Sequence, residues 1–283
     1  MTRSVFPSLF HRVLVLLLML AATPASFLPS ARAAEAPSGA DLMTNAYAQH
    51  PNDAVSSLRQ TDPDLVAMRD RLMSDSGVLS PELRHLVTIS VLTALQAADD
   101  IETAVDAALE DGVHPVKIRE AVYQCAPYAG FPRTEAAVRA MNDVFRRHGV
   151  ALPLEDQSTV TEESRFRDGL AVQKRIFGDA IDAMHAAAAD NQKTIMVTHL
   201  SAFCFGDIYT RRGLDLRERE LLTFSVISAL GGCESQVKSH VQGNVSAGND
   251  KNDLIAALET ALPLIGFPRT LNALSCVNAV LPD

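Results

Sequence analysis

The residues Gly130–Thr134, with the sequence GFPRT, recur unchanged at Gly266–Thr270. The text upstream of each copy also matches in the same order. LVTISVLTAL at 86–95 lies over LLTFSVISAL at 221–230. Two matches in the same order predict an internal duplication, so the two halves can be compared position by position.

Hydrophobic spacing predicts that both halves are helical. Apolar residues recur at intervals of three and four in nearly every segment, and no Asn-Gly or Asp-Gly turn joins two alternating runs. Ser80 before Pro81 is typical of a helix start, because serine caps a free amide and proline has none to satisfy. Asp215 with Glu218 has the pattern of a capping box. We therefore predict an all-α fold.

The amino terminus has the pattern of a secretory signal peptide. Arg3 and Arg12 precede an apolar run at 13–22, and Ala31-Arg32-Ala33 offers small residues at the positions that a signal peptidase reads. The apolar run is shorter than the roughly 20 residues that a membrane span needs. We predict that residues 1–33 are cleaved and that the protein is periplasmic or secreted, without stable insertion in a membrane.

The rest of the chain divides at changes in composition. Residues 34–60 form a polar arm, and 61–149 form the first repeat. Residues 150–163 lack helical spacing and are predicted to be a linker, after which 164–283 form the second repeat.

Charge and cysteine content narrow the classes of partner. The formal net charge is −9, and residues 1–33 carry three arginines and no acid, so the cleaved chain would be more acidic still. Such a chain lacks the basic surface that nucleic acids and anionic membranes require. An exported protein can form disulfides, but buried free thiols are an equal alternative here. The four cysteines are Cys125, Cys204, Cys233 and Cys276.

Glu220 and His240 are the candidate chemical pair. If they lie on consecutive antiparallel helices, the carboxylate can fix the imidazole tautomer, and the imidazole can then transfer a proton. The alternative is that His240 is an ordinary surface or core histidine. Repeat comparison favours a role, because Glu220 corresponds to His85 and His240 corresponds to Ala104. The scaffold is duplicated while the pair is not, which indicates one active and one structural half.

The second half resembles the carboxymuconolactone decarboxylase family, part of the alkylhydroperoxidase D-like superfamily. The resemblance lies in LDLRERELLT at 214–223, the spacing from His240 to Gly248, and the closing Gly266-Phe267-Pro268. Residues 165–281 resemble that decarboxylase over its whole length, and 62–148 look like a more divergent copy. The resemblance implies two tandem helical bundles and a homo-oligomer. In such an oligomer the pocket often lies at a subunit contact, which a tandem chain could form internally.

The superfamily includes two chemistries. Peroxidase members resemble C-x-x-C-x-x-x-H, and here Cys233 and His240 fit while Gln236 replaces the thiol nearest the histidine. Glutamine cannot form a thiolate, so the dithiol cycle is broken. The resemblance therefore favours decarboxylation without cofactor or metal. A thiol peroxidase that uses Cys233, and a noncatalytic oligomer that binds a small ligand, remain the alternatives.

For a small lactone-like or cyclic acid, we assign His240 as proton donor and Glu220 as its orienting partner. Arg219, Arg211 and Arg212 are candidate carboxylate clamps, because a guanidinium matches a carboxylate. Arg219 also corresponds to Arg84 in the first half, and its alternative role is a salt bridge at the helix start.

Tyr128 stands opposite Leu264 when the two halves are aligned. Its default interpretation is core packing.

Overall fold

The computed structural model describes residues 54–73 and 78–282. Helices make up most of these ranges, and no strand occurs in them, which confirms the all-α prediction. The predicted signal peptide lies outside the described residues. Of the predicted polar arm, residues 54–60 are described, and they belong to helix α2, Ala54–Thr61.

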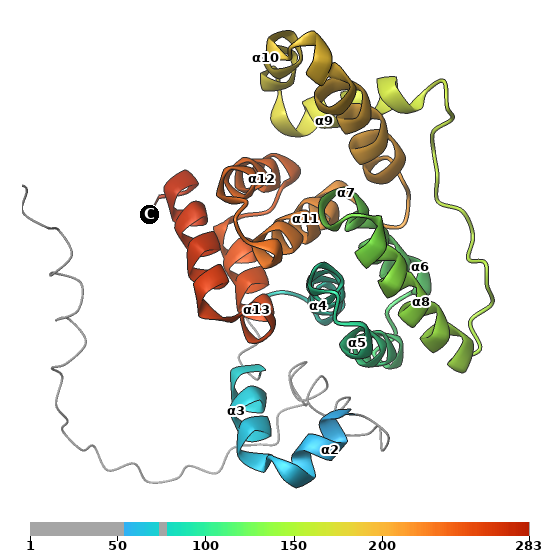
Figure 1. Ribbon diagram of the computed structural model, residues 1–283, viewed down its shortest axis with the longest axis vertical. Coiled ribbons are helices and arrows are strands. Elements are labelled where there is room, and N and C mark those ends of the chain that lie inside the picture. The colour runs from blue at the N-terminus through green and yellow to red at the C-terminus, as the bar shows by residue number, and fades with distance from the viewer. Residues whose placement is uncertain (1–53, 74–77, 283) are drawn as a thin grey trace, which may run out of the picture. The chain divides into compact units, whose positions relative to one another are not determined.

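The central helix of the first repeat, α4, begins at the predicted cap. Ser80 Oγ accepts the amide of Leu83 at 3.3 Å, with Pro81 in the first turn. The helices of this repeat are α3 Pro63–Met73, α4 Pro81–Leu95, α5 Ala98–Glu110, α6 Pro115–Gln124, α7 Ala126–Ala129 and α8 Phe131–Arg147 (Figure 1).

The second repeat follows a segment at 148–164 that contains no helix. Asp215 and Glu218 make the predicted capping box at the start of its central helix. The helices of this repeat are α9 Arg165–Phe177, α10 Ala180–Ala187, η2 Asp190–Gln192, η3 Thr194–Tyr209, α11 Leu216–Leu230, α12 Glu234–Ala247 and α13 Lys251–Val280.

The two repeats share one hydrophobic core. Helices α4 and α11, which carry the matched sequences, pack against each other and against helices of their own repeats. Leu86, Ile89, Leu221 and Phe224 on these two helices have no exposed surface. Each such side chain contributes roughly 1.5–3 kcal/mol by leaving water. Residues 84–94 of α4 and 219–229 of α11 are all buried, so each helix is enclosed on most sides.

The repeated GFPRT sequence forms the same helix break twice. Gly130 has φ 83° between α7 and α8, and Gly266 has φ 70° inside α13. Both values lie in the left-handed region that glycine adopts most easily. The hydroxyls of Thr134 and Thr270 donate to the carbonyls of these glycines at 3.0 and 2.9 Å. By length and composition α13 could cross a membrane; 33% of its most apolar window is buried, and Gly266 breaks the helix.

A close helix pair supports the site from one side. Helix η3 is wound with the wider i→i+5 hydrogen-bond pattern and packs along α9. Gly169 and Gly206 face the opposite backbone so closely that a methyl group on either would overlap it. The pair has its own apolar cluster, formed by Ile176, Cys204, Phe205, Ile208 and Tyr209. This packing fixes the end of η3, and therefore Tyr209, beside α11.

Candidate acid–base site

Glu220 and His240 meet in a helical hairpin. Glu220 lies in the first turns of α11 and His240 in the middle of α12, and His240 Nδ1 is 2.9 Å from Glu220 Oε2. The turn between the helices contains Gly231 and Gly232 with φ of 71° and 68°. Two successive glycines in this conformation accommodate the 20-residue separation of the pair.

The pair is buried and each polar atom of the carboxylate has a partner. The Glu220 side chain has no exposed surface, and Tyr209 Oη donates to its Oε1 at 2.7 Å. Because an ionised carboxylate only accepts, Nδ1 of His240 must be the donor. This leaves Nε2 of His240 for another partner, and 10% of the His240 side chain is exposed.

Aromatic rings hold the imidazole in place. Phe177 from α9 and Tyr128 from α7 meet the His240 ring edge-on, with centroid distances of 5.4 and 5.8 Å. Gly243 on α12 makes room for the carboxylate, because a Cβ at this position would lie 2.5 Å from Glu220 Oε2. The imidazole is therefore confined to one orientation.

Two tyrosines and a cysteine extend the site into a buried hydrogen-bond network that sequence reasoning missed. Tyr128 Oη lies 3.0 Å from Tyr209 Oη, and Cys204 Sγ donates to Tyr128 Oη at 3.6 Å. Tyr209 also contacts Thr223 Oγ1 at 2.8 Å. Tyr128 is therefore more than the core residue we predicted. The available signal was the repeat comparison, because its counterpart Leu264 has no hydroxyl.

Arg219 and Arg211 form a buried ion cluster across the repeats. The Arg219 side chain has no exposed surface, and it donates to Glu120 of α6 at 3.3 Å and to Gln124 at 2.8 Å. Arg211 holds both oxygens of Glu120 at 2.9 and 3.0 Å and lies over the Tyr123 ring. A guanidinium with no exposed surface cannot reach a solute, so the predicted clamp role does not fit Arg219. Arg219 instead forms the alternative that we considered, a salt bridge near the start of α11, with Glu120 as its partner.

The Arg212 side chain is exposed, whereas its backbone carbonyl accepts from Arg219 Nη2 at 3.3 Å. Its guanidinium donates to the backbone carbonyl of Asp156 in the predicted linker at 3.5 Å. This contact is long for a hydrogen bond, so it leaves the Arg212 side chain able to move.

A groove of about 520 Å³ lies near the pair, although neither Glu220 nor His240 lines it. Phe177, whose ring packs on His240, forms part of its wall, as do Ser239 and the two cations Lys174 and Arg175. Lys174 pairs with Asp182 at 2.6 Å, whereas Arg175 makes no ion pair within the described residues. Sequence reasoning did not select these two cations.

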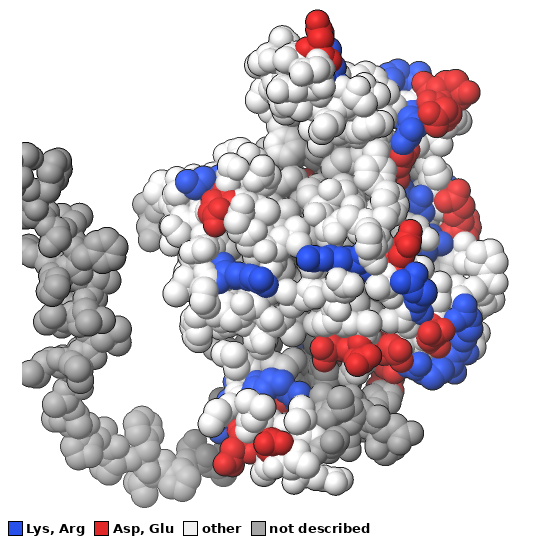
Figure 2. Space-filling model, in the orientation of Figure 1, with Lys and Arg blue, Asp and Glu red and all other residues white. Residues whose placement is uncertain are grey.

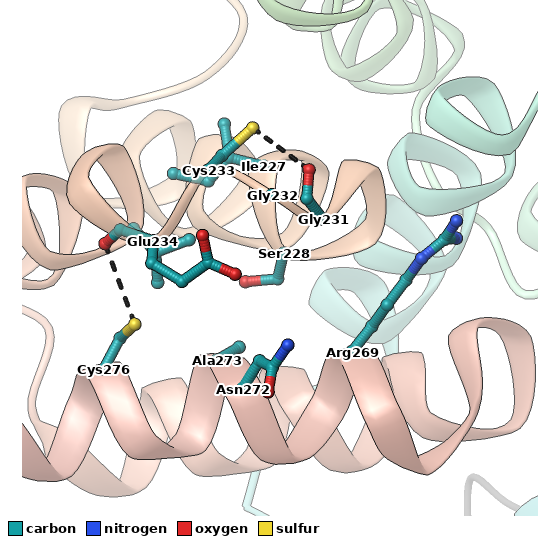
Figure 3. A pocket seen from close by; sticks show the side chains of 11 residues that line it. Ile227, Ser228, Gly231, Gly232, Cys233, Glu234, Arg269, Asn272, Ala273 and Cys276 are labelled. Atoms are coloured by element: carbon teal, nitrogen blue, oxygen red, sulfur yellow. Dashed lines mark hydrogen bonds between the residues drawn. The ribbon is translucent and has the colours of Figure 1, made fainter.

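Cys233 lines a separate small cavity of about 20 Å³, which has room for a single water. Its Sγ donates to the Gly231 carbonyl at 3.4 Å, and Cys276 Sγ donates to the Glu234 carbonyl at 3.7 Å (Figure 3). Burial raises the pKa of the Cys276 thiol. In Cys276 burial therefore favours the thiol over the reactive thiolate. All four cysteines are free.

The first repeat has no corresponding pair. His85 Nε2 bonds to Asp111 at 2.7 Å, and Ala104 occupies the position of His240. Burial lowers the pKa of His85, partly offset by Asp111, so the neutral form is favoured. Within the described ranges no group of histidine, cysteine and acidic side chains is arranged to hold a metal ion.

These features define a class of protein: an all-helical tandem repeat with a buried glutamate–histidine pair in one repeat. The sequence profile of the carboxymuconolactone decarboxylase family matches residues 62–143 and again 196–279, and the chain belongs to this family. The 4-carboxymuconolactone decarboxylase of Acinetobacter baylyi is 37% identical over 68 residues, or 24% of this chain. The match spans about half, 51%, of that relative.

Proposed function

We propose that the chain is a lyase that removes carbon dioxide from a small carboxylated lactone or cyclic acid without a cofactor. The observation that carries the proposal is the buried Glu220–His240 contact, which leaves Nε2 of the imidazole free to meet a substrate. Family membership and the named activity of the bacterial relative support the same class of reaction.

The reaction needs a proton donor and an electron sink. As the bond to the departing carboxylate breaks, its electron pair spreads into the unsaturated lactone and reaches the ring carbonyl. His240, protonated on both nitrogens, gives the Nε2 proton to the ring carbon, and solvent then reprotonates it. Glu220 holds Nδ1–H throughout and stabilises the imidazolium, the usual role of an acid beside a catalytic histidine.

The groove beside Phe177 is where the proposal places the substrate. Arg175 has no ion-pair partner among the described residues, and Lys174 adds a second cation to the same wall. A local basic wall is needed because the net charge of −9 opposes an anionic substrate. We therefore place the carboxylate at Arg175 rather than at Arg211 or Arg219, both of which Glu120 occupies.

Export and self-association belong to the same proposal. Export rests on the pattern of residues 1–33. Homo-oligomer formation is supported by Phe267 and Leu271, which are 61% and 55% exposed on α13. Nucleic acid is not a partner in this proposal, because basic and acidic side chains are interspersed on the face drawn in Figure 2. Amino-terminal sequencing of the secreted protein should begin near residue 34, and light scattering should give a mass above one chain.

The activity test uses purified mature protein and 4-carboxymuconolactone, followed by carbon dioxide release. We expect turnover that falls by roughly 100-fold or more in His240→Ala, because general acid catalysis is worth about that much. Cys233→Ser should leave turnover unchanged. Arg175→Gln should raise KM more than it lowers kcat, because it removes a binding contact.

The thiol alternative makes the opposite prediction. Hydroperoxide consumption that survives in His240→Ala and is lost in Cys233→Ser would overturn the lyase proposal. The noncatalytic alternative would replace it if the protein binds a small acid but turns over neither substrate.

A further inference from the structure

The hydrogen bonds that reach Glu220 run in one direction. Tyr209 has a single hydroxyl proton, and it gives that proton to Glu220 Oε1. Tyr209 must therefore accept from its other two neighbours, Thr223 at 2.8 Å and Tyr128 at 3.0 Å. The Tyr209 hydroxyl therefore accepts two hydrogen bonds and donates one to the carboxylate.

The direction is set at the far end by an arginine. Arg219 can only donate, so its Nη1 contact at 2.8 Å requires the amide oxygen of Gln124 to face it. The amide Nε2 of Gln124 then faces Thr223 Oγ1 at 3.0 Å. Thr223 accepts from Gln124 and gives its own proton to Tyr209. Arg219 can only donate and the Glu220 carboxylate can only accept. Together they determine the direction of every hydrogen bond between them.

The second branch has the same polarity. Cys204 donates to Tyr128, and Tyr128 donates to Tyr209. Burial raises the pKa of the Cys204 thiol to about 12 and the pKa of both tyrosines well above the usual value. All three groups therefore keep their protons across the neutral range and remain donors.

We propose that Gln124 and Tyr128, both from the first repeat, are positioning residues for the acid–base pair of the second repeat. They hold the Tyr209 proton on Glu220 Oε1, which leaves Oε2 to hold His240 Nδ1–H in one orientation. This inference rests on the proposed function for its kinetic consequence. It assigns the first repeat a part in the site although that repeat has no pair of its own.

The kinetic test measures kcat and KM for decarboxylation of 4-carboxymuconolactone. Tyr209→Phe should lower kcat roughly 10- to 100-fold with KM nearly unchanged, because a misplaced acid affects the chemical step more than binding. Tyr128→Phe should have a smaller effect of the same kind. Because Tyr128 acts through Tyr209, the double variant should be no slower than Tyr209→Phe alone. Tyr123→Phe, which keeps its ring over Arg211 and lies outside the network, is the matched control.

A variant that reverses one hydrogen bond distinguishes a positioning role of Gln124 from a packing role. Gln124→Glu keeps the size of the side chain and strengthens its contact with Arg219, but it can only accept. The Thr223 proton would then turn away from Tyr209. Positioning predicts lower kcat with an unchanged or higher melting temperature. Full activity in Gln124→Glu, or independent additive losses in the two tyrosine variants, would overturn the inference.

A second readout does not need turnover. In protein labelled with ¹⁵N-histidine, the hydrogen-bonded Nδ1–H of His240 should give a protected proton signal, assigned by its loss in His240→Ala. Tyr209→Phe and Gln124→Glu should shift this signal or speed its exchange with solvent, and Tyr123→Phe should not. An unchanged signal in both network variants refutes the positioning role. Absence of turnover in the wild type, with the signal changed as expected, refutes only the proposed reaction.

Discussion

Single residues in the site are fixed by the space that their neighbours leave. Gly243 is the clearest case, because Glu220 Oε2, Ile176 and Phe177 all approach the position where its Cβ would stand. Glycine within a helix normally costs stability, by roughly 0.5–1 kcal/mol relative to alanine. Here the missing side chain is what lets the carboxylate reach His240.

Gly243→Ala should therefore stabilise α12 locally while it harms the site. The methyl group would lie 2.5 Å from Glu220 Oε2, so the carboxylate must move. We expect kcat to fall at least tenfold, since displacements of about 1 Å at an acid–base site are costly. Val245→Ala, on the exposed side of the same helix, is the control, and steady-state kinetics with a thermal melt of each variant provide the measurement. Wild-type kcat in Gly243→Ala would show that Glu220 does not need its present place.

Single residues also show how much of the site could be predicted from the sequence. Glu220 and His240 could be selected because the sequence around them matches the first repeat, whereas the residues at these two positions differ from it. The repeat comparison singled out Tyr128 without giving its role, and it gave no signal for Glu120, because both residues act across the contact between the repeats. Glu120 lies 99 positions before Arg219. A buried tyrosine can serve only in packing, or its hydroxyl can join a hydrogen-bond network. Which of the two applies depends on the residues that surround the hydroxyl in the fold, and the local sequence does not determine them.

At the scale of helices, elements with local signals were predictable and elements defined by contacts were not. The starts of α4 and α11 follow from Ser80 and Asp215, whose side chains satisfy free amides within the same turn. The wide winding of η3 has no such signal. It accompanies close backbone packing against α9, which the glycines at 169 and 206 permit. The consequence for function is large, because η3 delivers both Tyr209 and Cys204 to the network.

At the scale of the whole molecule, the two repeats are joined by one apolar core and one ion cluster. Helices α4 and α11 share a single apolar core, and the ion cluster at Glu120 joins α6 of one repeat to Arg211 and Arg219 of the other. A buried pair of charges is stabilising only while both partners are present, because the loss of one leaves the other charged without a partner in the core.

Glu120→Ala tests this unity. Removal of the carboxylate leaves three arginines, Arg119, Arg211 and Arg219, without this acid, and the Arg219 side chain has no exposed surface. The change should cost about 3–5 kcal/mol of unfolding free energy. Because the core is continuous, the loss should lower the stability of both repeats together, in one transition. Urea unfolding followed by circular dichroism, and by amide exchange in each repeat, measures both points. Asp143→Ala, whose carboxylate pairs with Arg146 on the surface, should cost less than about 1 kcal/mol. If Glu120→Ala unfolded the first repeat while the second kept its protection, the repeats would be separate domains, and Gln124 and Tyr128 could not be held rigidly enough to orient the pair.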